Sequence, residues 1–105
     1  MKTLVLLLLL PSVLLADADL RKEFLTNYCT DCHGADRQKA DRRFDDLGAE
    51  ITSLDELDRW QEVVDLLNLE EMPPEDEPQP SSEERAAVIA SITDFVAEGD
   101  AKLSD

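Results

Sequence analysis

The feature that most constrains this chain is the run Cys29-Thr30-Asp31-Cys32-His33, which holds its only two cysteines and its only histidine. Two thiols three positions apart can reach the two vinyl groups of one haem and form thioether bonds with them. The residue that follows then falls under the iron, where an imidazole nitrogen can bind as proximal ligand. The run therefore predicts one covalently attached haem c, held by Cys29 and Cys32, with His33 as an iron ligand.

Three other interpretations of the run stay open at this point. The two cysteines could form a disulfide in an oxidising compartment, although so short a loop adds little stability. A thioredoxin-like redox pair is expected beside a βαβ pattern, and the chain has no alternating strand pattern. A zinc site needs four nitrogen or sulfur ligands, whereas the chain offers two cysteines and one histidine.

A second axial ligand follows by elimination. Apart from Met1, which belongs to the N-terminal segment described below, Met72 is the only methionine, and there is no second histidine. An isolated methionine is more often a core residue that fills a gap. Met72 stands instead between two glutamates and two prolines, where a core residue is not expected. We therefore expect His/Met ligation of the iron, which leaves no open coordination position and favours one-electron transfer over catalysis.

The N-terminal segment has the layout of a secretory signal peptide. Met1-Lys2-Thr3 carries one positive charge, an apolar leucine-rich run follows, and Ala16-Asp17-Ala18 has the small-x-small form of a cleavage site. The apolar run is broken by a proline and is shorter than the ~20 residues of a membrane-spanning helix. We expect a signal peptide over residues 1–18, cleaved after residue 16 or 18, a haem domain over residues 19–105, and a periplasmic or otherwise exported protein with no membrane span.

The chain is strongly acidic, with 25 Asp and Glu residues against 10 Lys and Arg residues and a net charge of -15 at pH 7. Such a surface repels phosphate backbones, which excludes nucleic acid as a partner. It favours encounter with a redox protein that has a basic docking face. A solvated acidic coat without a dedicated partner is the alternative.

The hydrophobic pattern predicts an all-α fold of about three helices. The first helix runs from about residue 20 to residue 28, with Asp19 as a possible N-cap and Leu20, Phe24 and Tyr28 on one face.

Two capping boxes mark the other helices. Ser53 with Glu56 begins the second helix, which should end near Leu69, and Ser81 with Glu84 begins the third, which Gly99 should stop. The apolar stripes are Leu57, Trp60, Val64 and Leu67 in the second helix and Val88, Ile89, Ile92, Phe95 and Val96 in the third.

Two loops, Gly34 to Thr52 and Glu70 to Pro80, are longer than a three-helix bundle of this size needs. Aromatic residues make up only 5% of the chain, so the core is thin and a bound cofactor is a usual source of stability. We expect the loops to wrap around the haem. Trp60 either contacts the haem or belongs to the core. A cluster of basic residues either balances the haem propionates or forms a solvated mixed-charge loop with neighbouring aspartates: Arg37, Lys39, Arg42 and Arg43.

The chain resembles the class I cytochromes c, most closely the short planctomycete-type cytochrome c domain, over roughly residues 20–98. The resemblance is carried by Tyr28-Cys29-Thr30-Asp31-Cys32-His33-Gly34, by Glu71-Met72-Pro73-Pro74 and by Pro78-Gln79-Pro80-Ser81. It implies a small class I cytochrome c-like fold, with thioethers at Cys29 and Cys32, His33 as proximal ligand and Met72 as distal ligand. The family often has an aromatic residue where Ser91 stands here, and this chain has no glycine in its first helix for a close crossing of the terminal helices.

The expected function is that of an exported mono-haem one-electron carrier, an electron-transfer protein rather than an enzyme. One alternative is a haem relay domain that serves a larger exported oxidoreductase. Another is an open-site haem peroxidase or ligand-binding protein, in which Met72 leaves the iron. A third is a non-haem binding module closed by a disulfide between Cys29 and Cys32.

Overall fold

The computed structural model describes residues 17–34, 36–39 and 42–104, and the regular structure in these ranges is helical. Helices cover residues 17–28, Leu54–Asn68 (α2) and Ser82–Leu103 (α3). Within the same ranges, β-type pairing is limited to one isolated bridge between His33 and Gln38. The predicted all-α fold is confirmed. The predicted signal peptide falls almost wholly on residues 1–16, outside the described ranges, and stays a prediction.

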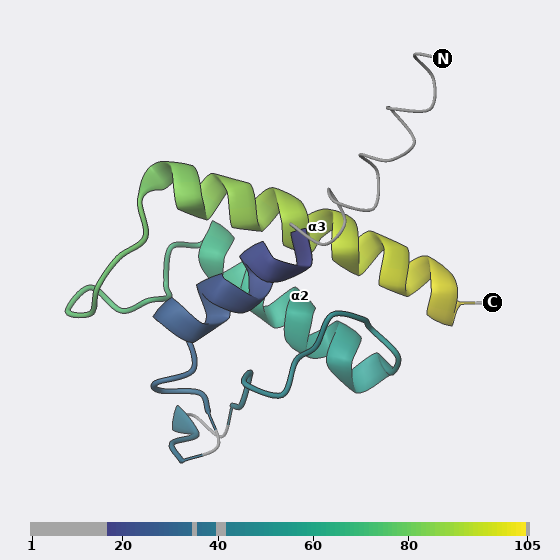
Figure 1. The fold of residues 1–105 in the computed structure, drawn as a ribbon, viewed down its shortest axis with the longest axis horizontal. Helices are drawn as coiled ribbons and strands as arrows, with labels where there is room; N and C mark the ends of the chain where they lie inside the picture. Colours follow the sequence, from purple (N-terminus) through teal and green to yellow (C-terminus); the bar gives the residue numbers. More distant parts are fainter. Residues whose placement is uncertain (1–16, 35, 40–41, 105) are drawn as a thin grey trace, which may run out of the picture.

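The loop 69–81 lies at one end of the molecule, and most of the loop before α2 runs along the side opposite α3 (Figure 1). α3 runs along one side, with α2 packed against it, and the end of the first helix lies near the start of α3 and the loop 69–81 (Figure 1). The core takes side chains from all three helices, and the long loop before α2 adds Phe44, Leu47 and Ile51. None of the helices in the described ranges is long and apolar enough to cross a membrane.

α2 begins at the predicted N-cap Ser53, but Glu56 accepts from the N–H of Thr52 where a capping box would use that of Ser53. The Ser53 side chain accepts a hydrogen bond from the backbone N–H of Glu56. The Glu56 carboxylate in turn accepts from the Ser53 hydroxyl at 3.1 Å and from the backbone N–H of Thr52 at 3.2 Å. All four predicted apolar positions of this helix are buried, and Val63 joins them.

α2 ends in a Schellman motif just before the segment that contains Met72. The N–H of Glu71 donates to the carbonyl of Leu66 at 3.1 Å, and the N–H of Glu70 donates to the carbonyl of Leu67 at 3.2 Å. The motif requires a left-handed residue, and Glu70 takes this role with a φ of 56°. Glycine usually occupies the position, because any Cβ is crowded in this conformation.

α3 begins at a complete capping box formed by Ser81 and Glu84. The Tyr28 hydroxyl, at the end of the first helix, also donates to the Glu84 carboxylate at 3.1 Å. These bonds lower the pKa of Glu84, with the backbone N–H of Ser81 as the main cause. The start of α3 is thereby tied to the segment that leads into Cys29.

The prediction that Gly99 stops the third helix is wrong, because α3 continues to Leu103. Gly99 is buried inside the helix, against the loop that precedes α2. A Cβ at this position would lie 2.9 Å from Cδ1 and 3.2 Å from Cβ of Ile51. Glycine is therefore present for close packing and not for helix termination.

The predicted N-cap of the first helix is also wrong. Residues 17 and 18 are already helical, so Asp19 lies inside the helix. The buried face holds Phe24 and Leu25, whereas Leu20 and Tyr28 are only partly buried.

Arg21 is the unexpected member of that face, with only 7% of its surface exposed. Its Nη1 donates to the Ser91 hydroxyl at 3.0 Å, and its guanidinium carbon lies 3.8 Å from the ring centroid of Phe95. Burial lowers the pKa of Arg21, while Asp17 and Glu98 oppose the shift. These two contacts join the first helix to α3 through a long side chain. A close helix crossing would need small residues instead.

Gly99→Ala should destabilise the protein by about 1 kcal/mol, because overpacking costs about 1–3 kcal/mol and the gain in helix propensity returns about 1 kcal/mol. In an Ile51→Ala background the same change should be neutral or stabilising. Chemical denaturation of the four proteins in this double-mutant cycle measures the effect. Strict additivity of the two changes would contradict the packing role of Gly99.

Glu70→Gly should stabilise the protein by about 1 kcal/mol, because glycine avoids the crowding of Cβ in the left-handed conformation. Glu71→Gly is the matched control, since Glu70 alone among the described non-glycine residues has a positive φ. Thermal melts should show a higher midpoint for the first variant and an unchanged or lower one for the second. A lower midpoint for Glu70→Gly would show that its side chain has another role.

Candidate haem-binding site

The first helix passes directly into a tight turn that carries the two cysteines and the histidine. The backbone N–H groups of Cys32 and His33 both donate to the carbonyl of Cys29, at 3.3 and 2.9 Å. Gly34 completes the turn, because a Cβ at that position would clash with the carbonyl oxygen of Thr30. The turn therefore fixes all three side chains relative to the helix axis.

The loop that follows returns over His33 and holds its imidazole. Nδ1 of His33 lies 3.3 Å from the carbonyl oxygen of Arg42, and the Phe44 ring lies 5.1 Å from the imidazole, centroid to centroid. Because a carbonyl can only accept, this contact assigns the proton to Nδ1 and leaves the lone pair of Nε2 free for a metal. His33 is 7% exposed, so its orientation is set by packing as well.

The two cysteines are free thiols and are partly buried. Burial raises the pKa of the Cys29 thiol to about 12, with a smaller contribution from Cys32. A thiol with so high a pKa stays protonated at neutral pH, which disfavours the thioredoxin-like interpretation. In the described part of the chain, no group of three or more His, Cys, Asp or Glu residues is placed to hold a metal ion.

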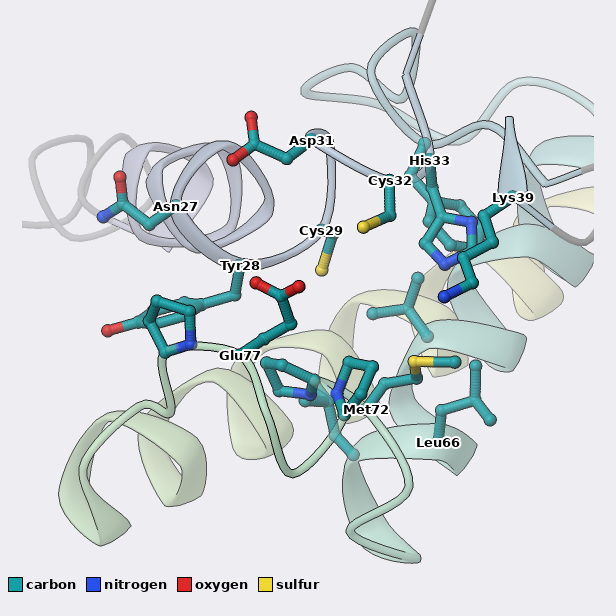
Figure 2. A pocket seen from close by; sticks show the side chains of 16 residues that line it. Asn27, Tyr28, Cys29, Asp31, Cys32, His33, Lys39, Leu66, Met72 and Glu77 are labelled. Atoms are coloured by element: carbon teal, nitrogen blue, oxygen red, sulfur yellow. The ribbon is translucent and has the colours of Figure 1, made fainter. Parts of the chain in front are cut away.

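Met72 reaches the same region from the other side of the fold. It follows the Schellman motif of α2, is partly buried, and faces the space into which Cys29, Cys32 and His33 project (Figure 2). All four residues line one cavity of about 140 Å³. Residues of both loops that are predicted to surround the haem line this cavity.

The cavity wall combines apolar side chains with polar and charged groups that are exposed to solvent. Apolar walls come from the loop before α2, from α2 and from the proline-rich loop: Phe44, Val63, Leu66, Leu67, Pro73, Pro74 and Pro78. Polar and charged groups are Asn27, Asp31, Lys39 and Glu77. A largely apolar macrocycle with two charged propionates needs this division of its surroundings.

The donor set fits a haem c group. Two thiols, an imidazole with a free Nε2 and a thioether meet at one apolar cavity, and these are the groups of a covalent His/Met haem site. Gly34 supports the same fit. Because it has no Cβ to clash with the Thr30 carbonyl, the turn can stay close under the first helix.

Comparison with known proteins gives one match. Residues 29–76 match the family model described as planctomycete cytochrome C. The match confirms the resemblance to the planctomycete-type cytochrome c domain over this segment. No curated protein and no solved structure matches the chain.

The cytochrome c segment extends from Cys29 through the loop over His33 and α2 to the Met72 loop. All four predicted haem-contacting residues fall inside it. The match to a cytochrome c family model indicates haem binding and electron transfer.

Trp60 of the cytochrome c segment belongs to the core and is absent from the cavity wall. It is 1% exposed and packs edge-on against Phe95 at 5.4 Å between centroids. Its Nε1 is buried, and within the described ranges it has no hydrogen-bond partner.

The basic cluster of the cytochrome c segment is mainly a mixed-charge surface. Arg42 pairs with Glu62 at 2.8 Å and Arg43 pairs with Asp45 at 2.6 Å. Lys39 is the member that lines the cavity. It is therefore the one basic residue of this group that is placed to face a propionate.

Sequence reasoning missed two supports of the site, Phe44 and the Arg42 carbonyl. Phe44 had a weak signal, as one of the few aromatic residues in a polar loop. A backbone carbonyl has none, because any residue type supplies one.

Proposed function

We propose that the chain is an exported mono-haem c-type cytochrome that carries one electron at a time. Cys29 and Cys32 hold the haem through thioethers, His33 is the proximal ligand and Met72 the distal ligand. One observation carries the proposal: these four residues line a single cavity, although α2 separates Met72 from the other three.

Bound haem c supplies a couple between ferric and ferrous iron. The chain orients His33 through the Arg42 carbonyl and shields the site with apolar side chains. A thioether ligand and a dry site favour the ferrous state, and nearby acidic residues favour the ferric state. Two strong ligands leave no position for a substrate, which separates this function from that of a haem peroxidase.

Charge at the cavity supports a basic redox partner. Asp31 and Glu77 lie at its edge, and Glu75 and Asp76 are exposed beside them in the sequence. A basic face on the partner would be attracted to this side of the molecule, with strong dependence on ionic strength. The signal-peptide pattern of residues 1–18 supports export.

The double change of Cys29 and Cys32 to alanine should abolish covalent haem attachment, and each single change should weaken it. Asp31→Ala is the matched control, since Asp31 is exposed within the same turn and offers no thiol. A pyridine haemochrome spectrum and haem staining after denaturing electrophoresis measure attachment. Haem retained by the double variant under denaturing conditions would contradict the assignment.

Met72→Ala should open a coordination position, lower the reduction potential and allow carbon monoxide to bind ferrous iron, while haem stays attached. Met72→His should keep six ligands at a lower potential. The long-wavelength sulfur-to-iron band of the ferric protein reports the bond directly. Leu66→Ala is the control, because Leu66 lines the same cavity without a donor atom. Absence of the band from the parent protein would favour an open-site haem protein.

A further inference from the structure

The loop that carries Met72 has few backbone hydrogen bonds of its own. In the described structure, beyond the Schellman motif, its backbone bond is from the N–H of Glu77 to the carbonyl of Pro74 at 2.9 Å. Four prolines between residues 73 and 80 fix φ and remove donors. These prolines stiffen the loop, but they do not fix where it lies relative to α2.

Arg85, on the first turns of α3, reaches across to this loop. Its Nη1 lies 3.3 Å from the carbonyl oxygen of Leu67 and 3.3 Å from that of Met72. Its Nη2 donates to Oε1 of Gln79 at 3.3 Å. The last turn of α2 contains no basic residue, so the Arg85 guanidinium supplies the positive charge that the carbonyl end of a helix favours.

Gln79 continues the network into the loop itself. Its Nε2 lies 3.0 Å from the carbonyl oxygen of Pro73, 2.7 Å from that of Pro74 and 3.1 Å from that of Glu77. The orientation of the Gln79 side-chain amide agrees with its partners, because Oε1 faces the Arg85 donor and Nε2 faces only acceptors.

We propose that Arg85 and Gln79 form a clamp that positions Met72 at the iron and sets how readily it leaves. The proposal rests on Met72 being the distal ligand, as in the proposed function. The clamp binds the carbonyls on both sides of the Met72-Pro73 bond and ties them to the end of α2 and the start of α3. When it is intact, opening of the distal side requires these bonds to break together. Arg85 and Gln79 are positioning residues, since neither lines the cavity.

The test uses the haem-loaded protein and three clamp variants, Arg85→Met, Arg85→Lys and Gln79→Leu. Arg85→Met and Gln79→Leu should bind carbon monoxide in the ferrous state about tenfold faster, as expected when a charge-assisted hydrogen bond no longer opposes opening. Their ferric sulfur-to-iron band should disappear at a lower denaturant concentration than the helical signal. Arg85→Lys keeps the positive charge but loses the several fixed N–H donors of the guanidinium. Its carbon monoxide binding rate should fall between those of Arg85→Met and the parent.

Arg59→Met is the matched control. Arg59 is a partly buried arginine of α2 that pairs with Asp46 and Asp55, away from the Met72 loop. Its loss should lower overall stability and leave the carbon monoxide rate within twofold of the parent. A change as large as that of Arg85→Met would assign the effect to general destabilisation and overturn the clamp.

The remaining outcomes separate the clamp from the ligand assignment. If the parent resists carbon monoxide, Met72→Ala binds it, and Arg85→Met and Gln79→Leu stay within twofold of the parent, the clamp is overturned and the ligand assignment stands. If the parent itself binds carbon monoxide as fast as Met72→Ala, the ligand assignment fails and the clamp fails with it. Should Arg85→Met not accumulate as haem-loaded protein, Arg85→Lys and Gln79→Leu give the same comparison.

Discussion

The backbone turn after the first helix is the constraint on which the site depends. The Cys29 carbonyl accepts the N–H groups of Cys32 and His33, and Gly34 lets the chain pass close under Thr30. The carbonyl of His33 then accepts from the N–H of Phe44 at 2.7 Å, which returns the loop to the turn. The loop brings the Arg42 carbonyl to Nδ1, and the imidazole is fixed with Nε2 available. The same few backbone hydrogen bonds thus position the candidate haem-binding residues and hold the loop that packs over them.

Features written in local sequence could be predicted well. The N-caps Ser53 and Ser81 each accept from a backbone N–H three residues on, and both helices begin there. The thiols and the imidazole of the site follow from one run, because the chemistry of attachment fixes their spacing. Met72 could be singled out because the chain offers no other soft neutral ligand outside the N-terminal segment, and it lines the same cavity as the three residues of the run. Each of these inferences requires only residues that are close in sequence, or a count of the side chains that can bind iron.

Features that depend on contacts between distant segments could not be predicted. Gly99 has the appearance of a helix stop, but its role is set by Ile51 on a separate loop. Arg21 has the appearance of a surface residue, and its burial depends on Ser91 and Phe95 of α3. Here a long side chain with a hydrogen bond and a cation–π contact joins the terminal helices, a solution that periodicity does not reveal. The Arg85 network could not be predicted for the same reason, since it joins α3 to the end of α2 and to the Met72 loop, in part through backbone carbonyls.

The two sides of the candidate haem site are held by different kinds of interaction. The His33 side is fixed by backbone hydrogen bonds within and around one turn, and substitution of side chains leaves most of them in place. The Met72 side is held by the side chains of Arg85 and Gln79, which contact the carbonyls of Met72 and of the prolines that follow it. In the proposed haem site, the His33 side would therefore be determined by topology, and the Met72 side would be adjustable by single substitutions outside the cavity wall. The difference between a closed electron carrier and an open ligand-binding protein in this fold is then a matter of how firmly the distal loop is tied, and it requires no change in the haem-attachment run.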